Sequence, residues 1–104
     1  MESEFKGTKG EWLWEENSAS DPHGSTCIGV STNGPQIAYL QSFSGWEEDY
    51  GREVTIANAN LISAAPELLD ACQWLLMALR DGTSMDVEIA KEKAESAIEK
   101  ALGK

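Results

Sequence analysis

The sequence predicts an α+β fold, in which an N-terminal three-stranded antiparallel sheet is packed by a C-terminal helical hairpin. Apolar residues alternate with other residues in the β-prone runs before residue 43, and they recur at every third or fourth position after residue 55. These are the periods of a half-buried strand and of an amphipathic helix. A chain of 104 residues is expected to form a single domain. We divide residues 1–104 into four parts: 1–9 (flexible), 11–43 (the sheet), 44–54 (an exposed loop) and 56–102 (the helices).

The first strand is predicted by alternation around three large apolar residues. Trp12 and Trp14 fall on one face of residues 11–15, and Leu13 falls on the other. The next ten residues are rich in turn formers and contain His23, the single histidine. We therefore expect a strand followed by a polar loop.

The second and third strands are predicted by the pair Asn33-Gly34, which lies between the β-prone runs 26–32 and 36–43. An Asn-Gly pair in this position is the strongest short signal for a hairpin. Pro35 cannot donate a hydrogen bond to the sheet, but a strand tolerates proline at its first residue. The three strands should form a meander with one face on the helices.

The segment after the sheet is too charged for a core strand, and Gly45 and Gly51 bracket most of it. Trp, Tyr and Arg dominate binding hot spots, and loops on a rigid scaffold are where binding residues concentrate. We therefore expect the principal contact surface here, with an alternative in which Trp46 packs over the sheet edge as part of the core. The candidate binding residues are Trp46, Glu47, Glu48, Asp49, Tyr50 and Arg52.

The helices are delimited by capping residues and one proline. Thr55 is expected to cap a short helix that begins at Ile56 and ends before Pro66, because proline is disruptive inside a helix and favourable in its first turn. A longer helix should run from residue 65 to 80 and end at Gly82. Thr83 or Ser84 should cap the last helix, roughly 85–102.

An apolar stripe in the second half is expected to form the helical part of the core. Its members are spaced by four or three residues and share one side of a helix: Leu61, Ala65, Leu68, Cys72, Leu75 and Leu79. Cys72 is expected to be a small buried hydrophobe. The stripe and an Ala-rich last helix present more apolar surface than three short strands can cover, so we expect a homodimer or a higher oligomer.

Residues 57–71 carry a family resemblance. The run Ala57-Asn-Ala-Asn-Leu-Ile-Ser-Ala-Ala-Pro-Glu-Leu-Leu-Asp-Ala71 resembles Ala-Asn-Ala-x-Leu-Ile-x-Ala-Ala-Pro-Glu-Leu-Leu in small uncharacterised accessory proteins of tailed phages and prophages. The end of the chain, Ala-Ile-Glu-Lys-Ala-Leu-Gly-Lys, is similar to their last helix, whereas the opening Lys9-Gly-Glu-Trp12 departs from their usual start. The resemblance implies a gene class that blunts host defences or redirects host enzymes, and it carries no catalytic residue.

The charge excludes some partners and favours others. The chain has 18 acids and 8 bases, a net charge of −10, and residues 1–53 hold ten acids against three bases, a net of −7. Such a field repels phosphate backbones, which makes direct nucleic-acid binding unexpected, and it attracts a basic protein surface. The alternative is that the acidity serves solubility alone. We expect no secretion signal and no membrane span, hence the host cytoplasm.

No motif in the sequence predicts catalysis, a metal site or a cofactor. His23 and Asp21 lack a nucleophile at a motif spacing, and one His with two distant Cys does not supply a zinc site. Residues 47–49 lack the spacing of a calcium loop, and Gly29-x-x-x-x-Gly34 lacks the Lys of a phosphate loop. We expect a non-enzymatic protein without a cofactor.

Two function hypotheses follow. The first is a protein that binds and inhibits a host factor, a component of antiviral defence, through an acidic surface. The second is an oligomeric sponge for a nucleotide signal. It requires cations and aromatic rings around a pocket, and the first half offers only Lys6, Lys9 and Arg52 as cations.

Overall fold

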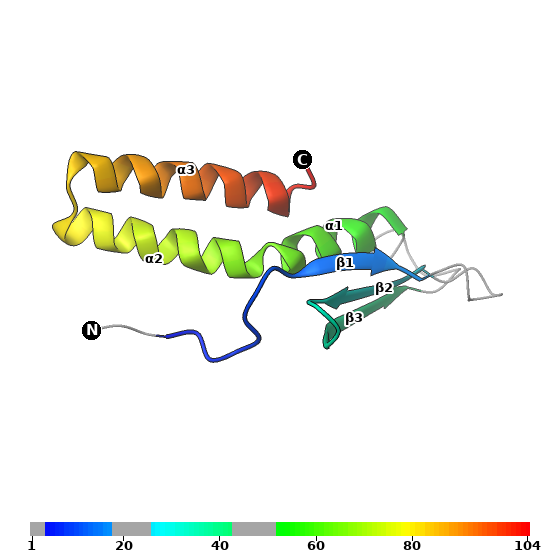
Figure 1. Cartoon of the computed structure of the whole chain (residues 1–104). Helices are drawn as coiled ribbons and strands as arrows, with labels where there is room; N and C mark the ends of the chain where they lie inside the picture. The colour runs from blue at the N-terminus through cyan, green and yellow to red at the C-terminus, as the bar shows by residue number, and fades with distance from the viewer. Residues whose placement is uncertain (1–3, 18–25, 43–51) are drawn as a thin grey trace.

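A computed structural model, which describes residues 4–17, 26–42 and 52–104, confirms the α+β class (Figure 1). Three strands come first and three helices follow. Their bounds are β1 Leu13–Glu16, β2 Thr26–Ser31, β3 Gln36–Ser42, α1 Arg52–Ser63, α2 Ala65–Asp81 and α3 Ser84–Ala101.

The sheet is an antiparallel meander in the order β1-β2-β3. The predicted turn is confirmed: Asn33 and Gly34 have φ values of 36° and 115°, and the Thr32 N–H donates to the Pro35 carbonyl over 3.2 Å. Both central residues therefore have the positive φ that a tight hairpin turn requires. Since proline has no N–H, the reciprocal bond of this pair is missing.

The first strand begins two residues later than predicted, at Leu13. Trp12 lies before it, and its indole Nε1 donates to the Thr8 carbonyl over 3.1 Å. Trp14 lies in the strand opposite Val30. The Trp12 indole is therefore held by the N-terminal segment, whereas the Trp14 indole donates to Asn60 of the first helix.

Helix α1 packs on the sheet through a line of residues at helical spacing: Thr55, Ala59 and Ser63 are buried. Ile28 and Val30 of β2 are fully buried. Thr55 does not cap this helix, contrary to the prediction, because α1 already begins at Arg52 and Thr55 belongs to its buried side. The predicted exposed loop 44–54 is wrong for residues 52–54, which are helical, and residues 44–51 lie outside the described part of the chain.

The ends of the longer helices follow local signals. Ala64 separates α1 from α2, and Pro66 lies in the first turn of α2, as predicted. Gly82 ends α2 with an extended backbone, φ −80° and ψ 159°, not with the left-handed one common at helix ends. Thr83 caps α3 in a capping box, in which its side chain accepts from the Asp86 N–H and its own N–H donates to the Asp86 carboxylate.

Alanines form the seam between α2 and α3. Ala71 and Ala78 are buried on α2, and Ala90 and Ala97 are buried on α3, each pair seven residues apart. This spacing keeps each pair on one side of its helix, and the small side chains allow a close approach.

The predicted apolar stripe is not the buried one. Leu79 is 81% exposed, Leu61 is 54% exposed, and Cys72 is exposed, whereas Leu68 and Leu75 are half-buried. The seam lies one residue before the stripe, about 100° around the helix. The alanine-rich side of α3 matches alanines on α2, so the leucines remain outside the hairpin.

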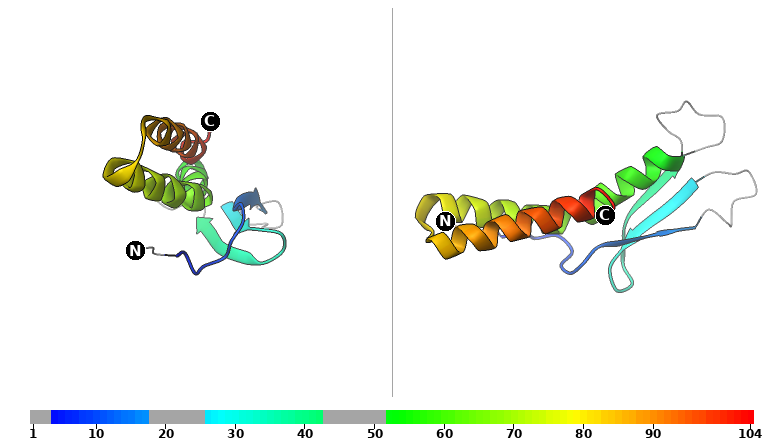
Figure 2. Two further views of the ribbon diagram at one scale, coloured as in Figure 1. Left: turned by 60° about the vertical axis from the view of Figure 1, so that its left-hand side comes forward. Right: turned by 90° about the horizontal axis from the view of Figure 1, so that it is seen from above.

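The helical hairpin extends away from the sheet, so the molecule is elongated (Figures 1 and 2). Its extents are 55 × 27 × 19 Å. Figure 2 shows α1 and α2 following one another along the long axis, with the sheet beside α1. Among the helices of the described residues, none has the length and apolar character to cross a membrane.

Candidate binding surfaces

Of the six predicted binding residues, the described part of the chain contains only Arg52. Trp46, Glu47, Glu48, Asp49 and Tyr50 lie outside it. Arg52 begins α1, and its guanidinium makes two contacts with the Glu16 carboxylate of β1, Nη2 to Oε1 at 2.5 Å and Nε to Oε2 at 3.3 Å. This forked pairing ties the start of α1 to the end of β1.

A cleft lies where the start of the sheet meets α1 and the end of α3. Its volume is about 260 Å³. We call it the indole cleft, and its lining residues are Trp12, Leu13, Trp14, Asn60, Ser63, Lys100, Gly103 and Lys104. Trp14 Nε1 donates to Asn60 Oδ1 over 2.8 Å, which holds β1 against α1.

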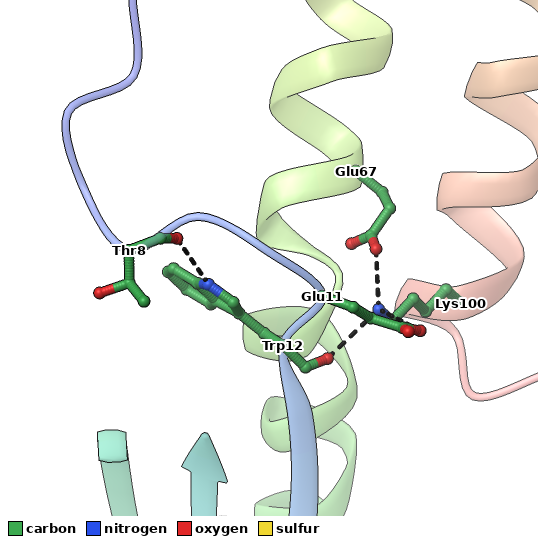
Figure 3. A network of polar contacts seen from close by, with 5 residues as sticks. All are labelled: Thr8, Glu11, Trp12, Glu67 and Lys100. Atoms are coloured by element: carbon green, nitrogen blue, oxygen red, sulfur yellow. Dashed lines mark hydrogen bonds and ion pairs between the residues drawn. The ribbon is translucent and has the colours of Figure 1, made fainter. Parts of the chain in front are cut away.

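Lys100 joins three segments at the edge of the cleft (Figure 3). Its Nζ lies 3.0 Å from Glu67 Oε2 of α2 and 3.6 Å from Glu11 Oε2, and it donates to the Trp12 carbonyl over 3.3 Å. The side chain is one-quarter exposed, so its contacts with Glu67 and the Trp12 carbonyl are partly shielded from solvent, whereas Glu11 is mostly exposed. The ammonium holds the N-terminal segment beside the two helices, and two carboxylates offset its charge.

One further feature favours a ligand in the indole cleft. Ser63 does not supply it, because its hydroxyl oxygen is buried from solvent, although it makes no hydrogen bond within the described residues. Lys104 is exposed and forms no ion pair within that part of the chain. The lining of the cleft thus combines two tryptophans with a cation, residue types that suit a small planar anion. No three His, Cys, Asp or Glu side chains in the described segments come together to hold a metal ion.

An acidic row runs along the outer side of α3, away from α2. Glu88, Glu92, Glu95 and Glu99 are spaced by four, three and four residues, which places them on one side of the helix, and all four are exposed. Only Glu88 forms an ion pair with a described residue, with Lys91 at 3.7 Å. The remaining three carboxylates are free to meet a cationic surface.

Sequence reasoning missed both features for different reasons. The indole cleft joins residues 12–14 to residues 100–104, and no local pattern indicates that the two ends meet. The acidic row has a clear signal, a 4-3-4 spacing of glutamates. The net charge is more negative in the first half of the chain, however, so the acidic binding surface was predicted there.

Comparison with known proteins places the chain beside a phage protein. The model of the family described as Salmonella phage P22 protein Y8K6 matches residues 1–104. No curated protein and no solved structure matches the chain.

Proposed function

Because this chain belongs to the family of Salmonella phage P22 protein Y8K6, we propose that it is a non-enzymatic phage accessory protein that binds and inhibits a host protein. The partner carries a basic surface and is a component of antiviral defence in the host cytoplasm. The acidic row of α3 is the observation that carries the proposal, and the predicted loop contact through Trp46 adds to it.

The electrostatic argument rests on where the carboxylates lie. The first and last glutamates of the row are eleven residues apart, about 16 Å along the helix, on the outer side of an elongated hairpin. A mainly negative field over this length steers a basic partner and raises its association rate. A nucleic acid would be repelled by the same surface.

The test compares two variants that lose the same charge from different surfaces. E88Q/E92Q/E95Q/E99Q neutralises the row, and Gln keeps nearly the helix propensity of Glu. E4Q/E15Q/E53Q/D81N neutralises four acids elsewhere. Each immobilised protein is incubated with host lysate at low and high salt, and the bound host proteins are quantified.

We expect the row variant to lose a partner that wild type and the control variant retain, and wild-type capture to fall with salt. Association kinetics with the purified partner should then show a lower rate constant for the row variant. If the row and control variants retain the partner equally, the row is not the contact surface. If no host protein is captured in a salt-dependent way, the proposal is overturned.

A second candidate function is binding of a small planar anion, such as a nucleotide signal, in the indole cleft. The presence of Trp12, Trp14 and Lys104 in its lining favours this candidate. Thermal-shift measurements against a nucleotide panel test this candidate. A rise of several degrees with one nucleotide, reduced by Lys104→Met and kept by Lys91→Met, would support the sponge. No shift with any nucleotide would contradict it.

A further inference from the structure

The helical hairpin has one apolar side, which we call the leucine face. Its members lie on the side of each helix that follows the seam alanines: Leu68, Cys72, Leu75, Leu76 and Leu79 of α2, Val87 and Ile98 of α3, and Leu102 directly after α3. Cys72 and Leu79 directly follow Ala71 and Ala78, and Ile98 follows Ala97, so each is turned about 100° from the seam. Because α2 and α3 are antiparallel, the same rotation directs both sets to the same side of the hairpin.

The described N-terminal segment contacts the hairpin on the side opposite the leucine face and leaves the leucine face uncovered. Glu67, four residues before Ala71, and Lys100, three residues after Ala97, are turned the opposite way from the seam. Glu11 and the Trp12 carbonyl contact Lys100 on that opposite side (Figure 3). Leu79, Leu76 and Ile98 remain 81%, 53% and 50% exposed.

The hairpin has no large buried side chain of its own. The two largest fully buried side chains of the described residues, Ile28 and Val30, both belong to β2. The buried residues of α2 and α3 are alanines, each of which contributes little hydrophobic stabilisation because it buries one methyl group. A hairpin built in this way gains a core only when its leucines are covered, which indicates a permanent partner.

Charge selects the kind of partner. The net charge is −10, yet the one charged residue within the leucine face is basic: Lys91 directly follows the seam residue Ala90, and the nearest acid on α3, Glu95, lies at the outer border of the face. A basic host surface would fit the acidic row and not this face. A second copy presents the same apolar surface, and a two-fold axis pairs such a patch with itself.

The leucine face is exposed on both helices. Besides Leu79, Leu76 and Ile98, Val87 is 37% exposed and Leu102 is 62% exposed. A second copy would therefore cover apolar side chains from both helices of the hairpin.

We infer that a second copy of this chain covers the leucine face, and that two hairpins pair about a two-fold axis into a four-helix bundle. The heptad spacing of Leu68, Cys72, Leu75 and Leu79 is the spacing that bundle cores use. The acidic rows of α3 then lie on the outside of the dimer and remain accessible.

The test measures mass in solution for the full chain and three single variants. Sedimentation equilibrium of wild type should give twice 11.3 kDa. Leu76→Lys and Ile98→Lys each place a charge on the leucine face from a different helix and should give one chain mass. Met77→Lys makes a similar change on the opposite side of α2 and should remain dimeric. Circular dichroism verifies that each variant is helical.

A second readout uses the two free thiols. Cys72 is exposed in a single chain and Cys27 is buried, so the dimer should slow maleimide labelling of Cys72 severalfold as protein concentration rises, and Leu76→Lys should abolish this dependence. A wild-type mass of one chain at all concentrations would overturn the inference. So would a dimer that survives both face substitutions, or Cys72 labelling that is independent of concentration.

Discussion

The indole of Trp14 donates to the side-chain carbonyl of Asn60 over 2.8 Å, and this bond connects residues 46 positions apart. Trp14 comes from β1 and Asn60 from α1, so the bond joins the first strand to the helix that covers the sheet. An N–H of a half-buried indole needs a hydrogen-bond acceptor. The Asn60 side chain supplies that acceptor for Trp14.

Asn60→Leu should destabilise the fold by about 1–2 kcal/mol, because it leaves the Trp14 N–H without its acceptor in a half-buried site. Asn58→Leu makes the same chemical change at an exposed position of α1 and should change the free energy of unfolding by less than about 0.5 kcal/mol. Urea unfolding followed by tryptophan fluorescence, at one protein concentration, measures both. Equal effects of the two substitutions would mean that the bond contributes nothing specific.

Ala90→Leu should destabilise the helical hairpin by about 1–3 kcal/mol, because the seam is closely packed and a larger side chain forces the helices apart. Ala90 is fully buried, whereas Ala57 is exposed on α1. Ala57→Leu is therefore the matched control and should be nearly neutral in the same unfolding measurement. A neutral Ala90→Leu would show that the seam tolerates volume and that alanine is not required there.

The features that the sequence predicted correctly depend on local signals. The turn at Asn33-Gly34, the helix break before Pro66 and the cap at Thr83 are each determined by a few adjacent residues. Backbone conformation at such positions is limited by φ preference or by a missing N–H, and it does not depend on distant partners.

The errors concern choices that only tertiary packing decides. Helix α2 carries two adjacent stripes, one of alanines and one of leucines, and hydrophobicity alone favours the leucines. The alanine side of α3 selects the alanines, so Ala71 and Ala78 are buried and Leu79 is not. The indole cleft depends in the same way on an encounter between Trp12 and Lys100, 88 residues apart.

Gly82→Ala should destabilise the hairpin although its φ of −80° is open to any residue. A Cβ at this position would lie 2.6 Å from the Ala78 Cα and 2.8 Å from its carbonyl oxygen, and backbone atoms cannot move aside without distorting the end of α2. The expected cost is about 1–3 kcal/mol, the range of overpacked sites.

Gly34→Ala should also destabilise the fold, but by backbone strain, since φ is 115° and nothing lies within 4 Å of the added Cβ.

These two glycine variants can be distinguished by their Asn substitutions. Asparagine tolerates positive φ better than alanine, so Gly34→Asn should recover part of the loss in unfolding free energy. Gly82→Asn should recover none, because the larger side chain meets the same backbone atoms. Recovery at Gly82 would show that conformation, not the close approach to Ala78, explains the glycine.

The last prediction concerns the loop and the start of α1. Trp46→Ala should weaken partner binding by about 2 kcal/mol or more, as expected of a hot-spot aromatic, with little change in the melting temperature. Arg52→Ala should weaken binding only if the partner or ligand is anionic. Its loss of the Glu16 ion pair should lower the unfolding free energy by less than about 1 kcal/mol, because the guanidinium is mostly exposed.

Glu47→Lys together with Glu48→Lys should slow association with a basic partner, since the field that steers it is reversed. Surface plasmon resonance with the purified partner measures these rates, and the E4Q/E15Q/E53Q/D81N protein is the control for net charge. A Trp46→Ala protein that unfolds would assign Trp46 to the core. One that folds and binds normally would move the contact surface away from the loop, and the acidic row of α3 would then be the surface to test next.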